Sequence, residues 1–231
     1  MKLTSRFLFL GMFAAMISLS ILSVATFAGP PLICHTFEID GAKSLPWISH
    51  DWRLTGSENY DTRNLAADTT AILNSNQNVL VHMETLRRAT LYAKSDPIAA
   101  KQLLIMIVTA SKNSISDKQA VAMSKFDAGY LAETYKQWLG EKSQNPANGL
   151  DGYALVKEAI QLRGGSDGQM EFAAALIGLN GPASDQRDFA QKAIESAKHD
   201  PLLARNLSTH FIGADSETMA EMIGRTRIAK N

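Results

Sequence analysis

Small and apolar residues recur at intervals of four, three, four and three between residues 79 and 93. This spacing places them on one face of an α-helix, because 3.6 residues complete each helical turn. Arg87, Arg88 and Lys94 fall outside the stripe, so we expect them to face solvent. The stripe consists of Val79, Met83, Leu86, Thr90 and Ala93.

The same period, interrupted by short polar or glycine-containing turns, predicts helices through most of the chain. The run from Leu103 to Val108 is apolar on every side, which is typical of a central helix and also of a buried strand. We favour the helix, because it continues a helical phase from Pro97 to about Lys112 and no second strand candidate could pair with it. The predicted fold class is all-α, with stacked antiparallel helix pairs. The other helices are expected near residues 60–73, 117–139, 152–163, 170–179, 184–197, 201–213 and from 215 onward.

One stretch occurs twice. Residues 93–103 return as residues 197–207, with six of the eleven positions identical and three more closely similar. Each copy contains an Asp-Pro pair, Asp96-Pro97 and Asp200-Pro201. Asp is a good N-cap, since its carboxylate accepts from free amides, and Pro suits the first helical position. Each copy is therefore expected to end one helix, turn a corner and begin the next.

The segment before the helices has a different pattern. Residues 29–58 show no helical period but carry many large apolar residues, too many for a solvated linker. We expect an extended arm that lies in a groove of the helical body. Residues 140–149 form the predicted loop between an N-terminal helical half, residues 59–139, and a C-terminal half, residues 150–231. The apolar residues of the arm include Leu32, Ile33, Phe37, Ile39, Leu45, Trp47 and Trp52.

The first 28 residues indicate an export signal. Two positive charges, on Lys2 and Arg6, precede an apolar run from Phe7 to about Phe27, and small residues end at Ala28. We expect cleavage after Ala28 and a periplasmic or extracellular location, without membrane attachment afterwards. The alternative is an uncleaved anchor, because about 20 apolar residues can span a bilayer.

Charge and cysteine content narrow the function classes. The chain has 23 basic and 23 acidic residues, and its densest basic cluster is Arg87-Arg88. A nucleic-acid-binding protein normally has a basic excess or stripe, so nucleic acid is not an expected partner. A single cysteine excludes an intramolecular disulfide framework, although export leads to an oxidising compartment. Packing must therefore stabilise the fold.

The repeated corner resembles the end of a tetratricopeptide repeat, in which an Ala-rich second helix is followed by Asp-Pro. The two copies are 104 residues apart, and three such repeats of about 34 residues span roughly 102. The resemblance covers those two corners. It implies a superhelical body whose concave face binds other proteins or peptides.

The arm holds one set of residue types that could bind zinc: Cys34, His35, His50 and Asp51. The alternative is a small buried apolar Cys with surface histidines, because adjacent side chains diverge on an extended chain. Haem attachment would need a second Cys three residues before Cys34, where Pro31 stands. We expect no cofactor.

A second candidate site lies in the longest predicted helix. Asp127, Tyr130 and Thr134 share a helical face and Glu133 is adjacent, so a carboxylate beside a tyrosine could perform acid–base chemistry. The alternative is that these residues are core and helix edge, since aromatic residues at helical spacing usually pack inside.

Two functions remain open. The leading hypothesis is an exported binding or scaffold protein for protein or peptide partners in a helical groove, because no catalytic motif is found. The rival is an exported helical hydrolase acting on envelope polymers, with Asp127 or Glu133 as the acid and Tyr130 as a helper. The sequence does not assign an enzymatic activity and favours a non-enzymatic role.

Overall fold

The computed structural model describes residues 32–48, 54, 56–113, 117–140, 145–179 and 186–210. These residues contain α-helices, one short 3₁₀ helix and no strand, which confirms the predicted all-α class. The expected export signal and the helix expected from residue 215 lie outside the described residues. In chain order the elements are η1 (Thr62–Asn64), α1 (Leu65–Asn74), α2 (Val79–Ala93), α3 (Pro97–Asn113), α4 (Lys118–Leu139), α5 (Gly152–Leu162), α6 (Gly168–Gly178), α7 (Gln186–Ala197) and α8 (Pro201–His210).

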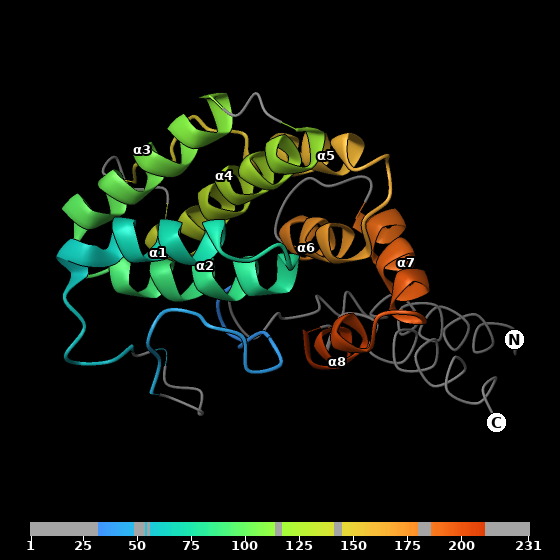
Figure 1. Ribbon diagram of the computed structural model, residues 1–231, viewed down its shortest axis with the longest axis horizontal. Helices are drawn as coiled ribbons and strands as arrows, with labels where there is room; N and C mark the ends of the chain where they lie inside the picture. Colours follow the sequence, from blue (N-terminus) through green and yellow to red (C-terminus); the bar gives the residue numbers. More distant parts are fainter. Residues whose placement is uncertain are drawn as a thin grey trace, which may run out of the picture.

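Helix α2 lies at the centre of the molecule (Figure 1). Every residue of α2 except Arg88 is buried. It packs against α1, α3, α4 and α6, while the chain from Leu32 to Ile48 passes along its remaining side. A helix enclosed on all sides loses the solvent face that the sequence pattern predicted for it.

The prediction that Arg87 faces solvent is therefore wrong. Arg87 is 1% exposed, because the extended arm covers the side of α2 that carries it. A guanidinium can be buried only when its charge and its donors are satisfied, so Arg87 must have fixed partners there.

Helix α3 was expected to be central and instead lies at one edge (Figure 1). Its buried side contacts α1 and α4. On its outer side Ile98, Ile105 and Met106 are 72%, 55% and 43% exposed. The run that is apolar on every side is thus buried on one side only, through Leu103, Leu104 and Ile107.

Both Asp-Pro corners form as the repeat predicts. Helix α3 begins at Pro97 and α8 begins at Pro201. Oδ1 of Asp96 accepts from the amides of Ile98 and Ala99 at 3.1 and 3.0 Å, and Oδ1 of Asp200 accepts from the amide of Leu203 at 3.0 Å. These bonds satisfy amides that have no partner within the helix, so both aspartates are N-caps.

Helices α4 and α5 approach each other closely. A Cβ added to Gly129 would lie 2.5 Å from the carbonyl oxygen of Gly152, and one added to Gly152 would lie 2.4 Å from that of Gly129. Glycine at both positions lets the two backbones meet. This contact accounts for a glycine in the interior of α4, where the residue is otherwise unfavourable.

Aspartates also cap three other helices. Asp117 and Asp151 cap α4 and α5. Asp167 caps α6 by accepting from the amide of Met170 at 3.1 Å. In the expected loop, Asn145 is buried and its amide donates to the carbonyl of Tyr135 at 3.1 Å.

Within the described residues, no helix is long and apolar enough to cross a membrane.

Candidate functional site

The arm is held against the helical body by both its side chains and its backbone. The described part of the arm, residues 32–48, runs below α2 and reaches α8 (Figure 1). Leu32, Ile33, Phe37 and Leu45 are between 0 and 1% exposed and belong to the main hydrophobic core. The sequence prediction that an extended apolar arm packs on the helices is confirmed for these residues.

Side chains of α2 and α4 bind the first part of the arm backbone. Oε1 of Gln137 accepts from the amide of Leu32 at 3.0 Å, and Nη1 of Arg87 donates to the carbonyl of Ile33 at 3.0 Å. Oε2 of Glu84 accepts from the amide of Phe37 at 3.0 Å. An extended chain has no internal partners for its amides and carbonyls, so these side chains replace a neighbouring strand.

Asn206 of α8 binds both backbone groups of one arm residue. Its Oδ1 accepts from the amide of Glu38 at 2.9 Å, and its Nδ2 donates to the carbonyl of the same residue at 3.0 Å. Nδ2 also donates to the carbonyl of Leu202 at 2.9 Å, and Asn206 is 0% exposed. A primary amide offers one acceptor and two donors, and here all are used.

Three further side chains of α2 hold the end of the arm, two of them through its backbone. Nη1 of Arg88 donates to the carbonyl of Leu45 at 2.6 Å, and the hydroxyl of Tyr92 donates to the carbonyl of Pro46. The hydroxyls of Ser44 and Thr85 lie 3.0 Å apart. We call the helix residues that bind the arm backbone the arm-binding surface: Glu84, Arg87, Arg88, Tyr92, Gln137 and Asn206.

A buried charge cluster lies at the centre of the arm-binding surface. Glu84 is 0% exposed and its two oxygens accept from two guanidinium groups, Arg87 Nε at 2.7 Å and Arg88 Nε at 2.6 Å. Arg87 also lies over the ring of Trp47, 5.1 Å from its centroid. The two guanidinium groups share one carboxylate, and further donors of both bind arm carbonyls or, for Nη2 of Arg87, the hydroxyl of Thr36. Such partners are the condition for burying charged groups.

His210 closes the other end of this surface. Its ring stacks on Phe37 with centroids 4.3 Å apart, and its Nδ1 donates to the carbonyl of Asn206 at 2.9 Å. The pKa of His210 is lowered to about 3, chiefly by burial, while hydrogen bonds to the backbone oppose this effect and the neighbouring His35 and Arg87 add to it. The ring is therefore neutral at pH 7. No sequence pattern indicates this contact, because Phe37 and His210 lie far apart in the chain.

The proposed catalytic residues have different neighbours. Oδ1 of Asp127 lies 2.6 Å from Nδ1 of His82, whose Nε2 bonds the carbonyl of Asn76 at 3.0 Å. Both ring nitrogens of His82 are thus engaged, and Asp127 is 7% exposed. The Asp127 carboxylate raises the pKa of His82 against the opposing effect of burial, which is the larger single influence. The pair forms a buried link between α2 and α4.

Tyr130 and Glu133 do not join that pair. Tyr130 is 0% exposed and its hydroxyl has no hydrogen-bond partner, and burial raises its pKa, with the Glu84 carboxylate adding to the effect. Oε1 of Glu133 forms an ion pair with Lys136 at 2.7 Å. The arrangement places Tyr130 in the core and engages both carboxylates with basic side chains.

Of the four candidate zinc ligands, two lie within the described residues. Cys34 is half-buried and burial raises the pKa of its thiol. The ring of His35 lies 5.5 Å from that of His210 in an edge-to-face contact. His50 and Asp51 lie outside the described residues. Among the described residues no group of three or more His, Cys, Asp or Glu side chains could hold a metal ion.

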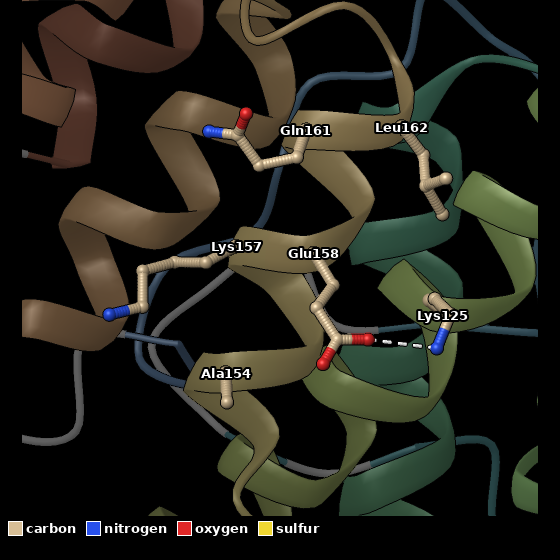
Figure 2. A pocket seen from close by; sticks show the side chains of 6 residues that line it. All are labelled: Lys125, Ala154, Lys157, Glu158, Gln161 and Leu162. Carbon is tan, nitrogen blue, oxygen red and sulfur yellow. Dashed lines mark hydrogen bonds and ion pairs between the residues drawn. The ribbon is translucent and has the colours of Figure 1, made fainter.

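A hollow of about 510 Å³ lies on the outer face of α5, beside Lys125 of α4 (Figure 2). Nζ of Lys125 and Oε2 of Glu158 form an ion pair of 2.8 Å across it, and Lys157 lies 4.6 Å from the centroid of the Tyr153 ring. This ion pair is exposed to solvent, and none of the candidate catalytic residues Asp127, Tyr130 and Glu133 lines the hollow.

Comparisons of the chain with protein-family models, with curated proteins and with solved structures found no match.

Proposed function

We propose that the protein is an exported binding or scaffold module whose helices hold extended segments of protein or peptide partners. The observation that supports this most is the arm-binding surface, where helix side chains bind amides and carbonyls of a chain with no secondary structure of its own. Contacts to the backbone recognise an extended chain whatever its side chains are, while the buried apolar positions select among sequences.

Export is part of the proposal and rests on the sequence. The charged start, the apolar middle and the small residues that end at Ala28 support secretion with cleavage before Gly29. Mass spectrometry of the exported protein tests it: a mature chain that begins at Gly29 is expected, whereas a membrane-bound chain that retains residues 1–28 would identify an anchor.

The architecture that we propose is a stacked array of antiparallel helix pairs of the tetratricopeptide kind. The equivalent corners at Asp96 and Asp200 support it, because both start a helix at the same point of the repeated sequence. Arrays of this kind present long surfaces on which an extended chain can lie.

The hydrolase alternative has no comparable support. Asp127 and Glu133 are each engaged with a basic side chain, and the hydroxyl of Tyr130 lies in the core. None of the three lines the hollow on α5.

Arm exchange on a nicked protein tests the binding function. A specific protease site is placed between Ile48 and Leu54, the folded protein is cut there, and a fluorescent peptide of residues 29–48 is added. We expect the labelled peptide to replace the cut arm and to bind saturably, as measured by fluorescence anisotropy. A peptide N-methylated at Phe37 and Glu38 lacks the two amides that Glu84 and Asn206 accept from, and should bind at least tenfold more weakly.

A matched pair of protein variants sharpens this test. Asn206→Ala removes the side chain that binds Glu38, whereas Gln191→Ala removes an exposed amide side chain of α7. We expect the first variant to weaken peptide binding and the second to leave it unchanged. Equal binding of the methylated and plain peptides, or no exchange by a helical body that stays folded, would contradict the proposed function.

A further inference from the structure

We propose that the outer face of α3 binds an extended segment of a partner protein, one in which an aromatic residue is followed three positions later by an acidic residue. The inference rests on the proposed function and assigns it a second site, separate from the arm-binding surface. It follows from comparing α3 with α8, the two helices that begin at the repeated corners.

Helix α8 carries a stripe of three residues, two of which contact the arm. We call Leu202, Asn206 and His210 the α8 stripe, which occupies the second, sixth and tenth positions of the helix. Asn206 and His210 are 0% and 6% exposed. The stripe faces the arm because residues four apart lie on the same side of a helix.

Three contacts describe how the arm lies on α8. Phe37 stacks on His210, and Glu38 bonds Asn206 through its backbone in both directions. Asp40 forms an ion pair with Arg205, which lies next to the stripe. The arm therefore runs from the end of α8 towards its beginning, with Phe37 and Asp40 three positions apart.

Helix α3 has the same stripe without a cover. Ile98, Gln102 and Met106, the α3 stripe, occupy the same second, sixth and tenth positions. Ile98 and Met106 are 72% and 43% exposed and Gln102 is also exposed. The described part of the arm does not cover this face (Figure 1). At its edge the hydroxyl of Thr70 of α1 donates to Sδ of Met106 at 3.1 Å, and Ile105, 55% exposed, extends the apolar area.

Each contact on α8 has a chemical counterpart on α3. Gln102 offers the same primary amide as Asn206, so it can bind the amide and the carbonyl of one extended residue. Lys101 stands where Arg205 pairs with an aspartate, and both are cationic. Met106 stands where His210 stacks on phenylalanine, and a thioether packs well against an aromatic ring.

The occupant is a segment of another protein rather than the protein's own arm. Phe37 is 1% exposed and its backbone is already bound by Glu84, while Glu38 is bound by Asn206. Moving the arm to α3 would expose the apolar core residues Leu32 and Ile33, which are 0% exposed, to solvent. The free energy lost in this way would exceed what the arm could gain by contacting the α3 face.

The experiment uses the intact mature protein and a fluorescent peptide of residues 32–42 with Cys34→Ser. The intact arm keeps its own site occupied, because it is tethered and so competes at a high effective concentration. We expect saturable binding, weakened about tenfold by Met106→Glu and about fivefold by Lys101→Glu. Lys118→Glu, the same charge change on the exposed start of α4, should leave the affinity unchanged.

A charge exchange identifies the pairing. The peptide with Asp40→Lys should bind the wild-type protein more weakly and bind the Lys101→Glu variant more tightly than the unchanged peptide does. The peptide with Phe37→Ala should lose affinity for the wild-type protein. All three substituted positions of the protein are exposed, so the variants are expected to fold, and their thermal melts verify it.

Three outcomes overturn the inference. Binding that is equally tight in the Lys101→Glu and Met106→Glu variants places the peptide elsewhere, and leaves the proposed function standing. Absence of binding to the intact protein rejects the α3 site, while arm exchange on the nicked protein decides the proposed function separately. A wild-type dimer that Met106→Glu converts to a monomer in light scattering would show that α3 serves self-association.

Discussion

The corner between α2 and α3 and the corner between α7 and α8 have the same local structure and different surroundings. In both, an aspartate caps a helix that begins with proline, and a second oxygen of that aspartate accepts from a side chain elsewhere, Thr62 at one corner and Gln169 at the other. The arm then covers the outer face of α8 and leaves that of α3 bare.

A repeated sequence thus encodes the local structure of a corner but not the segment that covers the helix beside it. The N-cap depends on residues that are adjacent in the sequence, so it forms wherever those residues are repeated. The cover depends on Glu38 and Asp40, which lie 168 and 165 positions from the residues they bond. Equivalent helix faces can therefore have different surroundings in one molecule, one covered by the arm and the other exposed to solvent.

The largest expected effect is on the free energy of unfolding when one of the two equivalent amide side chains, Asn206 or Gln102, is removed. Asn206→Ala leaves the amide and carbonyl of Glu38 without partners in a buried site, and should lower the free energy of unfolding by about 3 kcal/mol. Gln102→Ala should change it by less than about 0.5 kcal/mol, since Gln102 is exposed. Urea unfolding of both variants measures the contrast. Equal effects would mean that the arm does not depend on α8.

The next effect is a pH dependence that α8 has and α3 lacks. The pKa of His210 is lowered to about 3 by burial, with His35 and Arg87 acting in the same direction. The unfolded chain takes up a proton near pH 6.5 while the folded protein does not, so stability falls as the pH drops from 6.5 towards 3. The loss should be about 2 kcal/mol between pH 7 and pH 5.

The control for this prediction is His210→Phe, which keeps the stack on Phe37 and cannot titrate. The pKa of His82 is raised, so it acts in the opposite sense: its contribution is complete below the unfolded pKa and is lost as the pH rises through the folded pKa. Denaturation curves of both proteins across this range isolate His210 by difference. Parallel curves would show that His210 is not buried in the neutral form.

The smallest effects concern the caps. Asp96→Ala and Asp200→Ala should each cost about 0.5 to 2 kcal/mol. Asp96→Asn should be nearly neutral, because the Thr62 hydroxyl can accept as well as donate. Asp200→Asn should cost about 1 kcal/mol more, since Nε2 of Gln169 can only donate to it and Oε1 of Gln169 lies 3.3 Å from the amide of Leu80. Thermal melts of the four variants rank them, and a neutral Ala at both sites would show that these are not caps.

The parts of the fold that depend on neighbouring residues were predictable from the sequence. Caps at Asp96, Asp117, Asp151 and Asp200 and the close approach at Gly129 follow from local residue chemistry. Two predictions about exposure failed, those for Arg87 and for the outer face of α3. Helical periodicity tells which residues share a face, whereas the position of the arm decides which face is covered.

The candidate site was predictable only in outline. The apolar residues of the arm indicated that it packs on the helices, but no sequence pattern indicates that Glu84 and Arg87 bind its backbone. His82 and Asp127 looked independent, since they are 45 positions apart, and only the packing of α2 on α4 brings them to 2.6 Å. Contacts between distant segments leave no periodic signal in one sequence.

Hydrogen exchange along residues 32–48 tests the central claim, that helix side chains hold an extended backbone, most directly. Free amides of an unstructured chain exchange rapidly, and helical ones slowly. The amides of Leu32, Phe37 and Glu38 bond Gln137, Glu84 and Asn206, so they should exchange as slowly as those of α2, and Asn206→Ala should speed Glu38 selectively. Exchange of all three amides at the rate of an unstructured peptide, in a protein whose helices stay protected, would contradict the account.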